Sequence, residues 1–386
     1  MSKELLILLF LAILGSGCSN TTLGDFIDLT RRDSVSITDF VDSIDVVQLE
    51  SNSQCFIRDI NKLIFYEDNF YILDSRQQAL LCFSNMGEFK YKIHSVGRGP
   101  EEYSLLDDFN IDPYNKHLML LNPFGEILYY DLEGNFIEKV VLPSECKAYN
   151  EVHAINRDTL LFVTLTDFHL VYYSSSSNKI LKRELLIDPR LRSMSPFGKM
   201  SRYRDSTYYN SSVMSKNEIY NLSSDNLSVD YIWNFGKLNY TEGQKKSLYD
   251  YIKERETNRE PLRLIDFVGK GKILNYYIRR NHETVRYRLA LVMVGASSDG
   301  ETETNVFVIY DKNRKNYNVI DKTTEGIQLY YVRSNINTSI VLWHFGSTID
   351  YKYYDMSILN EEQREIINNY NKDRDNPFLV VYHLKQ

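Results

Sequence analysis

An internal repeat constrains the fold of this chain more than any other feature of its sequence. The segment FYILDSRQQALLCFSNMGEFKYKI, from Phe70, is echoed by HLMLLNPFGEILYYDLEGNFIEKV, from His117. Both copies contain two apolar runs separated by turn residues, and equivalent glycines, Gly87 and Gly134, lie 47 residues apart. A period of about 40 to 50 residues is typical of a four-stranded propeller blade, and glycine suits a tight hairpin turn. The alternative is a chance likeness between two hairpins.

The rest of the chain also has the pattern of β structure. Its 30 Tyr and 19 Phe favour half-buried pleated surfaces. Short apolar runs bounded by turn residues recur about every 8 to 12 residues, which is typical of a sandwich, barrel or propeller. The predicted strands are residues 63–66, 70–73, 79–83, 118–121, 127–130, 160–165, 169–173, 218–222, 229–235, 272–278, 288–294, 305–310, 328–332 and 340–345. We therefore predict an all-β fold, and the repeat favours the propeller.

Two stretches predict helices instead. TEGQKKSLYDYIKERE begins with Thr241 followed three residues later by Gln244, and NEEQREIINNYN begins with Asn360 followed by Gln363. Each pair has the spacing of a capping box and precedes good helix formers. We expect two short helices inserted between strands, with their apolar side chains packed on the propeller.

The N-terminus has the order of an export signal. Lys3 is followed by ten apolar residues, 5–14, and by three small residues, 15–17. Ten residues form a helix of only about 15 Å, roughly half of a bilayer core, so a permanent transmembrane helix is not expected. We predict a signal peptide over residues 1–17.

Cys18 follows this signal directly. The sequence Leu-Gly-Ser-Gly-Cys resembles the lipobox of bacterial lipoproteins, in which the cysteine receives diacylglycerol and becomes the N-terminus. Here the leucine stands four residues before the cysteine instead of three. We predict a lipid on Cys18, a tether over residues 18–33 and a domain over residues 34–386. The alternative is an ordinary secretory signal with an incidental cysteine.

Charge and cysteine content narrow the possible partners. The net charge of −7 with scattered mixed signs provides no basic field, so we expect no nucleic-acid partner. Once Cys18 is assigned to lipid, Cys55, Cys82 and Cys146 remain. Three widely spaced thiols do not form a disulfide framework, although one disulfide stays possible. We expect mostly buried thiols.

One motif supports a family resemblance. With the lipobox and the repeat, VGRGPEEY at residues 96–103 resembles the six-bladed β-propeller lipoproteins of Bacteroidales-type bacteria, relatives of NHL-like propellers. Glu101 stands where that family has a glycine. SITDFVDSIDVVQLE, INKLIFYEDNFYILD and DNPFLVVYHLK also match in order. The resemblance implies an all-β, six-bladed β-propeller with two short helical insertions.

The two ends of the domain have a predicted role in closing the ring. A propeller often completes one blade with strands from both chain ends, because an open ring would expose unpaired strand edges. The candidates are residues 46–49 and residues 378–384. We expect these two segments to pair with each other.

The GRGPEEY motif has two interpretations. In the structural one, glycines and a proline form a sharp turn while Arg98 pairs with Glu101 or Glu102. In the functional one, Arg98, Glu102 and Tyr103 line a face of the propeller and hold a ligand. The candidate binding or structural residues are Gly97, Arg98, Gly99, Pro100, Glu102 and Tyr103.

Metal and catalytic motifs give no candidate residues. No HExxH or CxxC occurs, and the acidic residues 107, 108 and 112 lack EF-hand spacing. We expect those carboxylates to be solvated, and also His282 and Glu283, in a hairpin. We nominate no catalytic residue and no cofactor, while calcium or another metal at the propeller axis stays open.

These observations lead to a functional hypothesis. We expect a monomeric, lipid-anchored propeller in the cell envelope that binds a protein, peptide or glycan. The alternative is a propeller hydrolase or lyase with an axial metal, because an axial pocket leaves no local motif. The resemblance also implies a location, because surface-exported lipoproteins of the resembled bacteria tend to carry acidic residues directly after the cysteine. Here the first acidic residue after Cys18 is Asp25, so we expect the outer membrane with the domain facing the periplasm. Surface exposure is the alternative.

Overall fold

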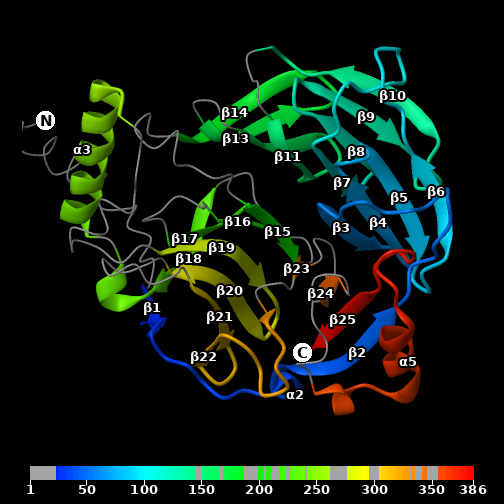
Figure 1. Cartoon of the computed structure of the whole chain (residues 1–386). Coiled ribbons are helices and arrows are strands. Elements are labelled where there is room, and N and C mark those ends of the chain that lie inside the picture. The colour runs from blue at the N-terminus through cyan, green and yellow to red at the C-terminus, as the bar shows by residue number, and fades with distance from the viewer. Residues whose placement is uncertain are drawn as a thin grey trace, which may run out of the picture.

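The strands of this protein form twisted sheets around a common centre, as in a β-propeller (Figure 1). The computed structural model describes residues 23–144, 149–164, 168–186, 199–203, 206–210, 217–222, 227–239, 241–260, 276–294, 304–329, 333–334, 341–345 and 355–386. The predicted signal, Cys18 and Cys146 lie outside these ranges. Within them, no helix combines the length and the apolar character needed to cross a membrane.

Six sheets are formed by the described strands. The β3–β6 sheet contains β3 (Lys62–Tyr66), β4 (Asn69–Asp74), β5 (Ala79–Ser84) and β6 (Phe89–Ile93). The β7–β10 sheet contains β7 (Asp108–Asp112), β8 (His117–Asn122), β9 (Glu126–Tyr130) and β10 (Phe136–Val141). The β11–β14 sheet contains β11 (Tyr149–Ala154), β12 (Thr159–Thr164), β13 (Phe168–Ser174) and β14 (Lys179–Leu186).

The other three sheets complete the arrangement. The β15–β18 sheet contains β15 (Lys199–Tyr203), β16 (Ser206–Asn210), β17 (Glu218–Asn221) and β18 (Ser228–Asn234), with β1 (Leu23–Phe26) added at its edge. The β19–β22 sheet contains β19 (Tyr276–Glu283), β20 (Tyr287–Val294), β21 (Thr304–Asp311) and β22 (Asn316–Ile320). The closing sheet contains β2 (Val41–Val47), β25 (Leu379–Leu384), β24 (Val341–Phe345) and β23 (Arg333–Ser334).

Burial explains why the middle strands are apolar without alternation. Five of the six residues of β4 and five of the six residues of β5 are buried. Neighbouring sheets pack on both faces of each blade, so both sets of alternating side chains are covered. In outer strands such as β10, by contrast, every residue is exposed or partly exposed. All-β propeller structure is therefore confirmed.

The repeat corresponds to equivalent turns in two adjacent sheets. Gly87 lies between β5 and β6 with φ of 85°, and Gly134 lies between β9 and β10 with φ of 87°. A Cβ at Gly87 would lie 2.0 Å from the Gln48 carbonyl oxygen, and one at Gly134 would lie 2.7 Å from the Tyr91 ring. Both glycines therefore allow a close approach to the preceding sheet as well as the turn itself.

Both predicted helices are present with their capping boxes. α3 (Glu242–Asn258) begins after Thr241, and α5 (Glu361–Asn369) begins after Asn360. Leu248 and Ile252 of α3 are fully buried, which accounts for the docking of this highly charged helix on the β structure.

The two ends of the domain form paired strands, as predicted for ring closure. β2 lies antiparallel to β25, with Val46 opposite Val380. The observed strands extend somewhat differently from the predicted segments, since β2 begins at Val41 and ends at Val47. The closing sheet thus joins residues more than 330 positions apart in the chain.

The predicted tether needs correction, because the chain is part of the domain from Leu23 onward. β1 pairs in parallel with β18. Ile27 and Leu29 are each only 2% exposed, and the Asp33 amide donates to the Val319 carbonyl of β22 at 2.8 Å. The helix α2 (Ile37–Phe40) and strand β2 follow. We call residues 23–47 the N-terminal belt, because it runs along the edges of three sheets.

Candidate functional site

The GRGPEEY motif forms a loop between β6 and β7 that is closed by its own backbone. The Gly97 amide donates to the Tyr103 carbonyl at 3.0 Å, and the Tyr103 amide donates to the Ser95 carbonyl at 2.9 Å. Val96 and Tyr103 form an isolated parallel bridge. The ends of the motif are therefore held side by side.

Glu102 fills the centre of this loop. Its Oε2 accepts a hydrogen bond from the Gly99 amide at 2.7 Å. A Cβ at Gly97 would lie 2.0 Å from the same oxygen, so the carboxylate occupies the space that any other residue at position 97 would need. The backbone oxygen of Glu102 also accepts from Lys139 Nζ at 2.9 Å. The glycines thus make room for an internal carboxylate bond.

Tyr103 anchors the loop in the core. It is only 1% exposed, and its hydroxyl donates to the Gln78 carbonyl at 2.6 Å. Burial raises the pKa of Tyr103 to about 12. Arg98 and Pro100, by contrast, are exposed, and in the described structure Arg98 forms no ion pair with Glu101 or Glu102. The sharp turn of the structural interpretation is therefore present, but its Arg98 ion pair is not, and Arg98 and Glu101 are both exposed.

Of the three carboxylates expected to be solvated, Asp107 is exposed, whereas Asp108 and Asp112 are buried. Asp108 is 5% exposed and pairs with Lys62 Nζ at 2.7 Å. Its second oxygen accepts from the Val152 amide at 3.1 Å. Burial raises the pKa of Asp108, and Lys62 opposes that rise. Asp112, 2% exposed, accepts from the Tyr114 amide at 2.8 Å. The prediction failed because both residues lie on β7, an inner strand that neighbouring sheets cover.

Asp108 belongs to a kind of link that recurs between adjacent sheets. The Glu151 carboxylate of β11 accepts from the Met200 amide of β15 at 3.1 Å. Asn210 of β16 donates to the Ile278 carbonyl of β19 at 3.2 Å. Buried polar side chains require such partners, and here the partner is the backbone of the next sheet. We therefore interpret these buried polar residues as connections between sheets.

The predicted hairpin around His282 and Glu283 is present, since β19 pairs antiparallel with β20, but the expectation that Glu283 is solvated is wrong. Glu283 is 8% exposed and accepts from Lys312 Nζ at 2.6 Å. Arg288 lies 3.4 Å from the Glu283 carboxylate, and its guanidinium stacks over Tyr231 at 3.8 Å. Burial lowers the pKa of His282 to about 3. These residues lie at the end of β19, where the adjacent β15–β18 sheet covers them.

Metal-binding geometry is not found in the described ranges. They contain no group of three or more His, Cys, Asp or Glu side chains that could hold an ion. Cys55 and Cys82 are buried free thiols, as expected for these two residues.

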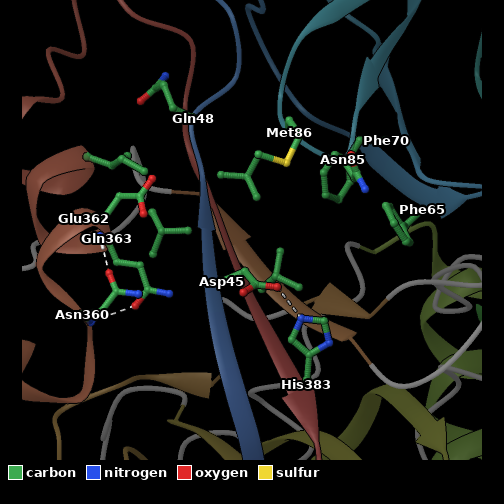
Figure 2. A pocket seen from close by; sticks show the side chains of 14 residues that line it. Asp45, Gln48, Phe65, Phe70, Asn85, Met86, Asn360, Glu362, Gln363 and His383 are labelled. Carbon is green, nitrogen blue, oxygen red and sulfur yellow. Dashed lines mark hydrogen bonds and ion pairs between the residues drawn. The ribbon is translucent and has the colours of Figure 1, made fainter.

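A surface pocket lies where the closing sheet meets the β3–β6 sheet. Its volume is about 530 Å³. One wall comes from β2 and β25, another from β3, β4 and the turn after β5, and a third from α5 (Figure 2). The lining residues are Asp45, Val46, Val47, Gln48, Phe65, Phe70, Asn85, Met86, Asn360, Glu362, Gln363, Ile366, Val381 and His383.

The pocket combines an apolar wall with a polar pair. Met86 is 76% exposed and projects beside Phe70 and Phe65. Across from it, His383 Nε2 lies 2.7 Å from Asp45 Oδ2 (Figure 2). Both partners remain substantially exposed, at 40% and 60%. This pair can therefore exchange hydrogen bonds with a bound molecule.

Local structure holds the pocket open. Gln363 of α5 donates to the Ile44 carbonyl of β2 at 2.6 Å and fixes the helix beside the strand. Sequence reasoning identified the strands and the helix but missed the pocket. Asp45 and His383 are 338 positions apart, and only the pairing of β2 with β25 brings them together.

Comparisons with known proteins agree with this fold. Residues 25–383 match the profile of a family described as a domain of unknown function, DUF4934. The chain belongs to this family. No curated protein sequence matches the chain.

Solved structures also resemble the chain. A presumed exported protein of Bacteroides fragilis shares 16% identity with a TM-score of 0.71, covering 95% of this chain and all of the other. A DUF4221 family member from Bacteroides vulgatus shares 6% identity with a TM-score of 0.49, covering 89% of this chain and 98% of the other. The Bacteroides fragilis likeness supports the fold alone.

Proposed function

We propose that this protein is a six-bladed, lipid-anchored propeller of the cell envelope that binds an extended peptide segment of a partner protein. Each of the six described sheets would be one blade. The observation that carries the binding proposal is the pocket of about 530 Å³ beside β2. Its apolar wall and its exposed Asp45–His383 pair offer both kinds of contact that a specific site uses.

The position of β2 favours a peptide over a glycan. β2 is the outermost strand of the closing sheet. Beyond Ile44, whose carbonyl accepts from Gln363, its backbone can accept an added strand. Side chains of such a peptide could then reach Phe65, Phe70 and Met86. A glycan partner would use the amide and carboxylate groups and the aromatic faces of the same pocket.

Export and anchoring are supported by sequence and by likeness. Cys18 follows a signal-like segment, and the similar Bacteroides fragilis protein is named as a presumed exported protein. We propose that the domain is attached through a lipid on Cys18 to the outer membrane and faces the periplasm. Metabolic labelling with a radioactive fatty acid should label the wild type and leave Cys18→Ala unlabelled. Equal labelling of both would contradict the anchor.

The binding proposal is tested with a matched pair of variants. Met86 in the pocket and Phe124 in a distant turn are each 76% exposed, so neither substitution should affect folding. After a peptide ligand is selected from a random phage-displayed library, Met86→Glu should weaken its binding about tenfold or more, whereas Phe124→Glu should leave it unchanged.

Two results would contradict the binding proposal. Equal affinities for the two variants would place the ligand elsewhere. Binding on a glycan array that Met86→Glu abolishes, with no peptide selected, would replace the peptide by a glycan.

A further inference from the structure

The N-terminal belt determines how far the domain can move from an anchor at Cys18. Only four residues, 19–22, separate Cys18 from Leu23, where β1 joins the β15–β18 sheet. Five Cα steps span at most about 18 Å when fully extended. The tether expected from the sequence, with its end at residue 33, would instead have spanned up to about 54 Å.

The width of the domain makes this difference decisive. A compact chain of this length is roughly 50 Å across. A 54 Å tether would let every face of the propeller reach the membrane, whereas an 18 Å connection admits only the rim near β1. The anchor therefore restricts orientation as well as location.

The attachment of β1 is well fixed. The Ile27 amide donates to the Asn234 carbonyl at 2.8 Å, and the Asn234 side chain donates to the Gly24 carbonyl at 2.8 Å. Tyr310 of β21 donates to Asp25 at 2.9 Å. Ile27 and Leu29 are buried in the core cluster that also contains residues of β18, α3 and β20. Detaching the belt would expose these side chains, so the short connection is not easily lengthened.

The pocket lies on the other side of the ring. In Figure 1, β1 lies at the lower left, whereas α5 and the β3–β6 sheet lie at the right. The residues of the pocket come from α5, from the closing sheet and from the β3–β6 sheet. The surface near β1 and the pocket are thus separated by much of the width of the domain.

We infer that the rim of the β15–β18 sheet at β1 faces the lipid bilayer, so that the pocket lies on the side of the domain away from the membrane. This inference rests on the proposed lipid on Cys18. The surface that this rim contacts is the bilayer. The orientation follows from the length of chain between Cys18 and β1. A partner would then approach from the compartment that the domain faces.

Energy transfer to the membrane tests this orientation. A fluorescent amino acid is placed at Ser228, an exposed residue of β18, or at Met86. The lipidated protein is reconstituted into phosphatidylethanolamine–phosphatidylglycerol vesicles with an acceptor on the lipid headgroup. Transfer from Ser228 should exceed transfer from Met86 about twofold or more, because roughly 50 Å of protein separates the two rims. Equal transfer, or stronger transfer from Met86, would overturn the inference.

Two controls separate this inference from the anchor itself. Cys18→Ala should abolish transfer from both positions, and unchanged transfer in that variant would overturn the proposed anchor. A flexible Gly-Ser insertion of about 15 residues between Thr22 and Leu23 should keep vesicle binding but reduce the difference in transfer between Ser228 and Met86. If the insertion left the difference between Ser228 and Met86 intact, the short connection would not be its cause.

Discussion

The sheets from β3 to β14 are each built from one consecutive stretch of chain, whereas the other three sheets also take contacts from the N-terminal belt. β1 extends the β15–β18 sheet, Asp33 bonds β22, and β2 completes the closing sheet. Consecutive strands pair through short hairpins and need no distant partner. The three sheets that contact the N-terminal belt depend on contacts between residues some 200 to 340 positions apart. The molecule thus contains blades whose strands are consecutive in the sequence and blades that need the N-terminal belt to complete them.

The largest effect should come from removing the C-terminal part of the closing sheet. A chain that ends at Asn371 lacks β25, in which Leu379 and Val380 are almost fully buried. Since β25 lies between β2 and β24, β2 would lose its paired strand and β24 would keep only β23. We expect loss of cooperative thermal unfolding by circular dichroism. A melting temperature equal to that of the full chain would contradict the closure.

Core substitutions should separate the two kinds of region. Leu120 in β8 is fully buried, and Leu120→Ala should lower the free energy of unfolding by about 2–5 kcal/mol. Leu29 in the belt is 2% exposed. Leu29→Ala should mainly loosen the belt, giving faster proteolysis near Thr30 and a smaller change in global stability. If Leu29→Ala unfolded the domain as strongly as Leu120→Ala without early cleavage, the belt would not be a separate unit.

The belt should also make stability depend on pH. Burial acts to raise the pKa of Glu325, but hydrogen bonds from Ser36 Oγ at 2.5 Å and the Ile37 amide at 2.9 Å outweigh it and lower the pKa to about 2. The pKa of Glu in an unfolded chain is about 4.3. Because the folded pKa is the lower one, this stabilisation is present above about pH 4.3 and is lost as the pH falls towards 2.

The measurement is urea unfolding between pH 6 and the acid limit of folding. Wild type should lose up to about 3 kcal/mol through Glu325 over this interval, and Glu325→Gln should lose correspondingly less. The matched control is Glu133→Gln, an exposed residue in the turn after β9. Identical pH profiles for wild type and Glu325→Gln would show that the link to Ser36 contributes nothing.

The smallest effect on stability is expected in the GRGPEEY loop, which lies between two sheets made of consecutive strands. Tyr103→Phe removes the hydroxyl that donates to the Gln78 carbonyl at 2.6 Å. We expect a loss of about 1 kcal/mol in the free energy of unfolding. Arg98→Ala, at an exposed position, should leave stability unchanged. A larger loss for Arg98→Ala than for Tyr103→Phe would mean that the loop is held by its arginine.

The same comparison explains what the sequence could predict. The repeat, the hairpin glycines and both capping boxes depend on residues that are close in the chain, and each has its expected structure. β17 and β18 were predicted as well, whereas β1, β7, β11, β15, β16 and β23 were not. β7 carries Asp108, Asn110 and Asp112, so its polar residues hid a buried inner strand.

The belt and the pocket depend on distant contacts and leave little local signal. Ile27 and Leu29, together with Leu23 and Phe26, do not alternate regularly and so give no strand pattern. The burial of Ile27 and Leu29 is decided by the sheets that they cover. Residues 328–332 were predicted as a strand from their apolar content. Gln328 and Leu329 are not in a strand, and residues 330–332 lie outside the described ranges. Leu329 is fully buried without belonging to a strand.

Hydrogen exchange of the N-terminal segment tests the account most directly, because both the joined sheets and the membrane orientation depend on the belt. Mass spectrometry of peptides covering residues 23–47 should show protected amides at Ile27 and Asp33, which donate to β18 and β22 at 2.8 Å, and along β2. Protection should match that of the outer strands β6 and β10. Exchange of residues 23–33 at the rate of unstructured chain, while the sheets stay protected, would show that this segment is a tether after all.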